Sequence, residues 1–130
     1  MFDSDTPKII SRLYDIIAAV ESALIGRFTV QPHQCQGERA LFFANADGQR
    51  FFYFGVWYEL WSRSSFPLWY GVHSQWSSAT VQTFLEQHPE AVGFEGYHLC
   101  RAECAPIFDD GPIEPVVELI TQELDILTRS

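Results

Sequence analysis

The chain has 130 residues, of which 47% are apolar and 19% are charged, and its formal net charge is −9. This length suits a single domain with its own core, spanning residues 1–130, and the composition is that of a globular protein rather than a disordered one. One lysine and seven scattered arginines argue against nucleic acid as a partner, because phosphate contacts need clustered basic side chains.

The acidic charge is concentrated in the second part of the chain. Residues 1–85 carry a net charge of −1, whereas residues 86–130 carry ten acidic side chains against two arginines, a net charge of −8. A segment of this kind can attract a basic partner over a long range, or it can serve solubility alone.

The N-terminal region has the clearest helical pattern. Thr6 suits an N-cap, Pro7 suits the first helical position, and Gly26 suits a helix end. Apolar residues recur between them at helical spacing: Ile9, Ile10, Leu13, Ile16, Ile17, Val20 and Leu24. We predict an amphipathic helix whose apolar side packs on a sheet or on another helix.

Strand patterns dominate the middle of the chain, over residues 28–30, 39–45, 49–61 and 66–73. The dipeptide Asp47-Gly48 predicts a two-residue hairpin turn in which Ala46 pairs with Gln49. Because proline cannot donate a ladder hydrogen bond, Pro67 places the strand after it at or near a sheet edge.

The last third of the chain alternates helix, strand and helix. Ser77 or Ser78 can cap a short helix that ends before Pro89, residues 91–101 read as a strand, and residues 113–127 repeat apolar side chains at helical spacing. We therefore expect an α+β fold. Its antiparallel sheet of four to five strands, a β-meander with aromatic hairpins, packs against an N-terminal, a middle and a C-terminal helix.

The aromatic side chains gather in one block, residues 51–76, which holds all four tryptophans and eleven of the twenty aromatic residues. The predicted turn register assigns them to faces by alternation. One face, expected to be core, carries Leu41, Phe43, Phe52, Phe54, Val56, Tyr58 and Leu60. The other face carries Ala40, Phe42, Ala44, Phe51, Tyr53, Gly55, Trp57, Glu59 and Trp61.

The second face is the candidate contact surface, because tyrosine and tryptophan often dominate the binding energy of interfaces. The expected function is that of a non-enzymatic, acidic protein-binding protein of the inhibitor, immunity or anti-defence type. Its partner is another protein, basic in the favoured case, and permanent cover by the chain itself or a homodimer are the alternatives. The predicted partner-binding residues are Tyr53, Trp57, Glu59, Trp61 and Trp69, with Glu114, Glu118 and Asp125 steering the partner.

Candidate chemistry is sparse. His98, Cys100 and Cys104, with His88 or Cys35, offer ligand types for zinc, but Cys100 and Cys104 are not spaced as a tight pair. We expect ordinary buried cysteines, with no catalytic residue, metal or cofactor. A small ligand-binding domain or enzyme with a pocket near Tyr70, His73 and Trp76 is an alternative.

The compartment is inferred from cysteine usage and from the N-terminus. The chain has three cysteines without a CxxC pair, and Asp3 and Asp5 stand where a signal peptide would carry basic residues. No apolar run approaches the roughly 18 residues of a membrane span. We predict a cytoplasmic protein that does not contact a membrane.

Two resemblances accompany these expectations. The element order, acidity and size resemble class I type III secretion chaperones, which implies a stable dimer that holds an extended effector segment. The hairpin GVWYELW…PLWYGV is similar to strand pairs in accessory domains of some PD-(D/E)XK nuclease-like proteins. No motif assigns the chain to a family.

Overall fold

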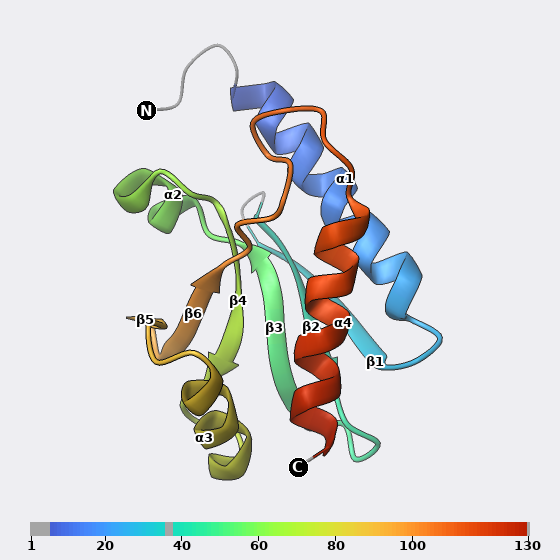
Figure 1. Cartoon of the computed structure of the whole chain (residues 1–130), viewed down its shortest axis with the longest axis vertical. Coiled ribbons are helices and arrows are strands. Elements are labelled where there is room, and N and C mark those ends of the chain that lie inside the picture. The colour runs from blue at the N-terminus through green and yellow to red at the C-terminus, as the bar shows by residue number, and fades with distance from the viewer. Residues whose placement is uncertain (1–5, 36–37, 130) are drawn as a thin grey trace.

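The computed structural model describes residues 6–35 and 38–129, which form four helices and one six-stranded antiparallel sheet (Figure 1). The helices are α1 (Thr6–Leu24), α2 (Tyr58–Ser64), α3 (Ser78–Gln87) and α4 (Glu114–Arg129). The strands are β1 (Thr29–Cys35), β2 (Glu38–Ala44), β3 (Arg50–Val56), β4 (Leu68–His73), β5 (Val92–Phe94) and β6 (Tyr97–Arg101), in the spatial order β1-β2-β3-β4-β6-β5. The predicted α+β class is confirmed, with slightly more strands than expected.

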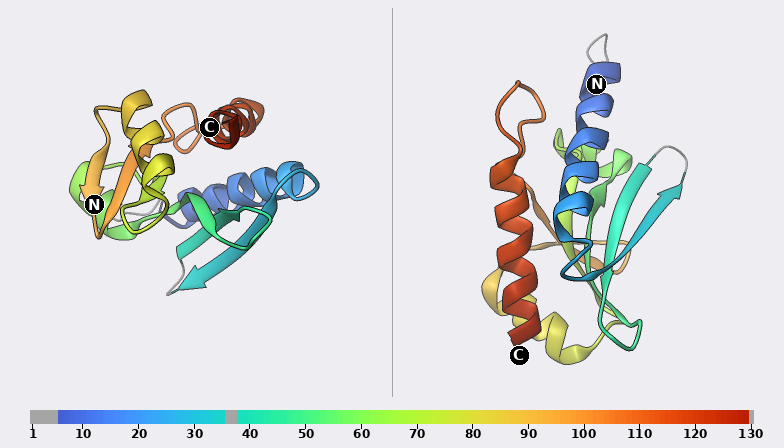
Figure 2. Two further views of the ribbon diagram at one scale, coloured as in Figure 1. Left: turned by 90° about the horizontal axis from the view of Figure 1, so that it is seen from below. Right: turned by 90° about the vertical axis from the view of Figure 1, so that its right-hand side faces the viewer.

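The long helices cover one face of the sheet, here called the helix side. Helices α1 and α4 lie side by side over β2 and β3, and α3 packs against β4 (Figures 1 and 2). The apolar stripe predicted for each long helix faces this core. The most deeply buried helical side chains are Leu13, Ile16, Ile17, Val20 and Leu24 of α1 and Val116, Ile120, Leu124 and Leu127 of α4.

The opposite side of the sheet, here called the open face, carries a second apolar cluster. Its buried members are Ala40, Phe42, Tyr53, Leu60, Trp69 and Leu99, with Trp57, Phe66, Trp76, Phe94 and Tyr97 partly buried around them. Helix α2 borders this cluster through Leu60. Most of its cover consists of aromatic side chains from neighbouring strands and turns rather than a helix layer.

The β2–β3 hairpin has the predicted register but not the predicted turn. The Asn45 side chain accepts hydrogen bonds from the backbone N–H groups of Asp47 and Gln49, and Gly48 takes the left-handed conformation (φ 80°). The backbone N–H of Asn45 also donates to the carbonyl of Gln49, so the loop has three residues, 46–48, rather than two. A bulge between Phe43 and Ala44 then restores the expected pairing, with Phe43 opposite Phe52.

The bulge also changes the face of one aromatic residue. Phe51, predicted for the open face, belongs to the core of the helix side instead. An extra residue in one strand shifts the alternation of side chains locally, so the residues next to the turn cannot be placed by counting from it.

The segment after β3 is a helix, not the predicted continuation of the strand. Helix α2 starts after Trp57 and ends at Ser65, which lies in the left-handed region (φ 62°). A continued strand would place Leu60 on the helix side and Trp61 on the open face. In the helix the two side chains exchange faces. Leu60 borders the open face and Trp61 joins the core of the helix side, so the predicted face of each is wrong.

Two further strand predictions are corrected. Residues 91–101 form a hairpin rather than one strand, because Glu95 (φ 54°) and Gly96 (φ 86°) both adopt the positive φ angles of a type I′ turn. Strand β4 is not at an edge but lies between β3 and β6. Pro67 immediately precedes β4, where its carbonyl accepts a hydrogen bond from Trp57 and no ladder donor is needed.

Among the described residues, no helix is both long enough and apolar enough to cross a membrane.

Gly71 in β4 allows β6 to pack closely against β4. A Cβ atom at Gly71 would lie 1.9 Å from the carbonyl oxygen of His98 in β6, whereas a Cβ at Gly93 would meet nothing within 4 Å. We expect Gly71→Ala to lower the free energy of unfolding by about 3 kcal/mol or more, since backbone must move to relieve the clash. Urea denaturation measures this change. An effect of Gly71→Ala no larger than that of Gly93→Ala would contradict this packing.

Candidate functional site

The predicted aromatic contact residues occupy three different environments. Trp57 is half-buried on the open face. Tyr53 and Trp69 point to the same face but are 4% and 2% exposed, so they lie beneath its surface. Trp61 belongs to the other core, and its 5% exposure leaves it no part in an open-face contact. The structure therefore brings Tyr53, Trp57 and Trp69 together and separates Trp61 from them.

The predicted acidic residues are also divided. Glu59 is exposed on α2, next to the open face, and forms an ion pair with Arg63 (3.4 Å). Glu114 and Glu118 are exposed on α4, and Asp125 on the same helix pairs with Arg27 at 3.3 Å. Because α4 covers the helix side, its acids and Trp57 lie on opposite sides of the sheet.

Trp57 lines two hollows on the open face. The first has a volume of about 150 Å³ and the second about 300 Å³, and Glu38 and Trp57 line both. The first is lined by His33, Glu38, Ala40, Phe42, Tyr53, Val56, Trp57 and Tyr97, and the second by Glu38, Trp57, Tyr58, Glu59, Phe94 and Glu95. Aromatic rings and the carboxylates of Glu38, Glu59 and Glu95 therefore lie around Trp57.

Small residues allow the rings of the first hollow to pack closely. Ring centroids lie 5.8 Å apart for Tyr53 and Trp57 and 5.5 Å apart for Trp57 and Tyr97, within the usual range for aromatic pairs. A Cβ at Gly55 would lie 2.6 Å from the Tyr53 hydroxyl and 2.7 Å from the Cβ of Ala40. Gly55 and Ala40 therefore form the floor on which Tyr53 lies.

Some polar atoms around this hollow form hydrogen bonds and others do not. Burial raises the pKa of the Tyr53 hydroxyl well above its ordinary value, and the nearby Glu38 carboxylate adds to the rise. Glu38 accepts a hydrogen bond from the backbone N–H of Tyr58. The indole N–H of Trp57 is buried and donates to no described group. A buried donor without an acceptor costs free energy, which makes Trp57 the unusual residue of this face.

The chain's own arginines contact rings at the margin of the open face. The guanidinium carbon of Arg50 lies 3.9 Å from the ring centroid of Phe42, and that of Arg101 lies 5.7 Å from Trp69. Arg63 lies 5.6 Å from Phe94. These distances are typical of cation–π contacts, so the ring faces on this side already attract cations.

The residues of the expected pocket, Tyr70, His73 and Trp76, divide between the two sides of the sheet. His73 and Trp76 lie on the open face, where their rings are 6.0 Å apart. Tyr70 alternates to the helix side and packs against Phe84 of α3. The sheet separates Tyr70 from the other two residues, so they do not line one cavity.

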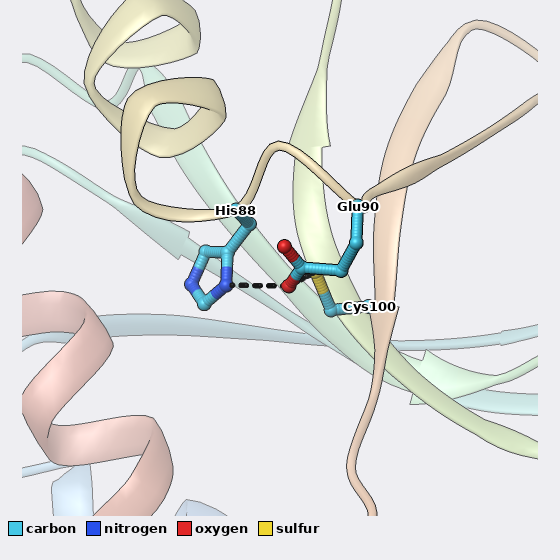
Figure 3. Close-up of side chains that lie close together, drawn as sticks. All are labelled: His88, Glu90 and Cys100. Atoms are coloured by element: carbon cyan, nitrogen blue, oxygen red, sulfur yellow. Dashed lines mark hydrogen bonds and ion pairs between the residues drawn. The ribbon is translucent and has the colours of Figure 1, made fainter.

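A polar cluster on the helix side joins His88, Glu90, Cys100 and Glu123. The Nε2 atom of His88 lies 2.8 Å from Glu123 Oε1, and its Nδ1 atom lies 3.3 Å from Glu90 Oε1. Cys100 Sγ lies 3.9 Å from the same Glu90 oxygen, and Figure 3 shows the Glu90 carboxylate between the imidazole and the thiol. Strand β6, helix α4, the C-terminal end of α3 and the turn between α3 and β5 meet here.

The charges in this cluster stabilise one another. Hydrogen bonds with Cys100 and with Glu123 raise the pKa of His88 to about 10, against the opposing effect of burial. Glu123 is 8% exposed, the one charged side chain found buried in the described chain. A buried carboxylate is costly unless it is paired, and His88 is its partner.

Sequence reasoning included His88 and Cys100 among several zinc candidates but missed both glutamates. A signal for Glu123 is present, because it falls three residues after Ile120 and four before Leu127, on the apolar side of its helix. Glu90 has no such signal, since a turn after Pro89 brings it back toward Cys100. His98 is not part of the cluster.

This cluster also borders a cavity of about 420 Å³, which lies beside β6. Glu90, Cys100 and Cys104 are among its lining residues, and Cys100 and Cys104 are free thiols. Sulfur, imidazole nitrogen and carboxylate oxygen are the donor types of zinc sites, and a thiol beside an imidazole is also the basis of nucleophilic catalysis.

Comparisons with protein-family models, with curated proteins and with solved structures found no match to this chain.

The His88–Glu123 pair is expected to act as a unit in stability. With EDTA present, Glu123→Gln and His88→Gln should each lower the free energy of unfolding by about 1–3 kcal/mol, because each leaves a buried polar partner less well paired. The double variant should lose at least about 0.5 kcal/mol less than the sum of the two. Urea unfolding at pH 7 measures all three.

The matched control is Glu118→Gln, an exposed acid on the same helix, which should change stability by no more than about 0.5 kcal/mol. Additive costs for His88 and Glu123 would show that the two side chains are not coupled.

Proposed function

We propose that this protein is a non-enzymatic binding protein whose open face receives a basic side chain of a protein partner. The observation that supports this most directly is the pair of hollows around Trp57, where ring faces and carboxylates meet. A cation is attracted both by the quadrupole of an aromatic ring and by a carboxylate. An inhibitor, immunity or anti-defence role is the class of activity that such a surface serves.

The size of the first hollow favours a side chain over a small-molecule ligand. Its volume of about 150 Å³ is below the range of about 300–1,000 Å³ that small-molecule pockets usually have. The end of one lysine or arginine fits a hollow of this size.

The acids of helix α4 keep the role predicted for them, long-range steering of the partner. Glu114 and Glu118 lie across the sheet from the hollows and cannot touch a ligand there, but they contribute to the long-range field of a chain with net charge −9. Glu38, Glu59 and Glu95 are the acids within reach of the ligand. A cytoplasmic location belongs to the proposal, supported by the free thiols of Cys100 and Cys104.

The proposal predicts a selective response to a basic peptide. A lysine- and arginine-containing decapeptide should shift the indole N–H resonance of Trp57 in a saturable way, whereas a glutamate-rich decapeptide of equal length should not. Trp57→Ala should weaken binding at least tenfold, because aromatic anchors in interfaces often carry more than about 1.4 kcal/mol. Nuclear magnetic resonance and calorimetry provide the two readouts.

Trp76→Ala is the matched control, since Trp76 is partly buried on the same face but lines neither hollow. Equal losses for Trp57→Ala and Trp76→Ala would contradict a site at Trp57. Light scattering on the same samples detects a second copy on this face, the arrangement that a secretion-type chaperone would use.

Two pairs of acids separate contact from steering. Glu59→Gln with Glu95→Gln removes two charges beside the second hollow, and Glu114→Gln with Glu118→Gln removes two charges on α4. We expect the first pair to raise the dissociation constant at least threefold and the second to slow association alone, by less than threefold. Both effects should shrink as salt rises from 20 to about 150 mM. Stopped-flow fluorescence with the basic peptide measures the rates, and equal effects of the two pairs would count against contact at the hollows.

A further inference from the structure

We propose that His88, Glu90 and Cys100 form a binding site for one divalent transition-metal ion of the zinc type. Their potential ligand atoms, one nitrogen, one oxygen and one sulfur, all lie within 4.8 Å of one another. The site lies on the helix side and shares no residue with the hollows around Trp57, so it does not rest on the proposed protein-binding function.

The spacing of these atoms is close to that of a tetrahedral metal centre. Zinc–ligand bonds of about 2.0–2.3 Å at tetrahedral angles place neighbouring ligand atoms about 3.3–3.8 Å apart. His88 Nδ1 and Glu90 Oε1 are 3.3 Å apart, and Cys100 Sγ and Glu90 Oε1 are 3.9 Å apart. Two of the three distances between ligand atoms are therefore close to the required values before any ion binds. The third distance, from the imidazole to the Cys100 thiol, falls within the 4.8 Å that contains all three ligand atoms (Figure 3).

Glu123 supplies an independent observation that points to the same use of His88. A histidine that binds a metal usually donates its other ring N–H to a carboxylate or carbonyl, which fixes the ring and its tautomer. Glu123 Oε1 lies 2.8 Å from Nε2 of His88, on the ring edge away from Glu90. The Nδ1 atom is thereby left facing Glu90 and Cys100.

The fold holds the imidazole firmly in that orientation. The backbone N–H of His88 donates to the carbonyl of Phe84 and ends α3, and the imidazole packs 4.7 Å from the Phe84 ring and 5.8 Å from Tyr70. The following turn, closed by a hydrogen bond from Ala91 to the carbonyl of His88, returns the chain toward β6. A ligand set on rigid elements of this kind costs little to organise when the ion binds.

The donor atoms select the class of ion. A thiolate and an imidazole favour zinc and its neighbours in the transition series over calcium or magnesium, which prefer oxygen alone. Glu90 and Cys100 also line the cavity of about 420 Å³, which has room for a water molecule as a fourth ligand. Cys104 lines the same cavity but is not among the three clustered ligands, so it serves as a control thiol.

Cobalt(II) is the probe, because zinc has a filled d shell and no useful spectrum. The full chain, reduced and freed of metal by a chelator, is titrated with cobalt chloride and then with zinc chloride. We expect one cobalt per chain, a thiolate-to-cobalt charge-transfer band with the d–d intensity of a four-coordinate ion, and loss of both on adding one equivalent of zinc.

The variants assign the ligands. Cys100→Ser should abolish the charge-transfer band, whereas Cys104→Ser should retain it with an affinity within about threefold of the parent. Glu90→Gln should weaken cobalt binding at least tenfold, and because its side chain is 68% exposed the variant should fold normally, which circular dichroism verifies. Glu123→Gln should weaken binding about 10–100-fold without removing the band, as expected for a residue that orients a ligand.

Three results would overturn the proposal: binding without a thiolate band, equal loss in Cys100→Ser and Cys104→Ser, or an affinity unchanged in Glu90→Gln. Failure of the basic peptide to bind at Trp57 would leave each of these measurements unaffected, so the two proposals stand or fall separately.

Discussion

The register between the central strands decides what each side of this protein can do. Strands β2, β3 and β4 are apolar on both faces, so a shift of one residue would exchange the side chains beneath the helices for those on the open face. Pairing of Phe43 with Phe52 sends those rings under α1 and α4, and pairing of Phe42 with Tyr53 sends the latter two outward. A helical layer is available on one side alone, and the open face must bury its rings with short segments.

Small residues make that second burial possible. Gly55 lies opposite Ala40 in β2 and opposite Trp69 in β4, and Gly71 lies opposite Tyr53. Gly55 and Gly71 have no side chain, so the neighbouring rings can pack flat against the sheet at these positions. The rings then pack against one another in edge-to-face and tilted pairs, so most of the cluster is covered although no long helix lies over it. Trp57 closes the cluster at the end of β3, and its unpaired indole N–H is the one obvious cost.

Much of the fold could be predicted because local patterns determined it. The apolar spacing of Leu13 to Leu24 and of Val116 to Leu127 leaves little freedom to place α1 and α4. The pairing of Phe43 with Phe52 was predicted from Asp47-Gly48 and alternation, although a longer turn and a bulge produce it. The prediction failed where the period changed within a few residues. The seven-residue helix after Trp57 reversed the faces of Leu60 and Trp61, and the bulge beside Ala44 moved Phe51.

The candidate sites were harder to predict than the fold. Tyr53, Trp57 and Trp69 share one face because alternation holds in β3 and β4. Whether a ring is exposed depends on segments far away in sequence, such as the hairpin that carries Tyr97. The cluster at His88 depends even more on tertiary structure, because Glu123 is 35 residues away from its partner. A glutamate on the apolar side of a helix was the available signal, and a buried carboxylate needs a partner that the sequence alone does not name.

Strand β6 connects the two sites and also keeps them apart. It presents Tyr97 to the open face and Cys100 to the helix side, since three positions along a strand reverse the direction of the side chain. Five residue pairs hold β6 against β4, whereas β5 pairs along three residues and leaves the Cys100 end of β6 beside the cavity. The two proposed sites therefore share the backbone of β6 but no side chain. Because β4 fixes that backbone along its whole length, occupation of one site should change the other little.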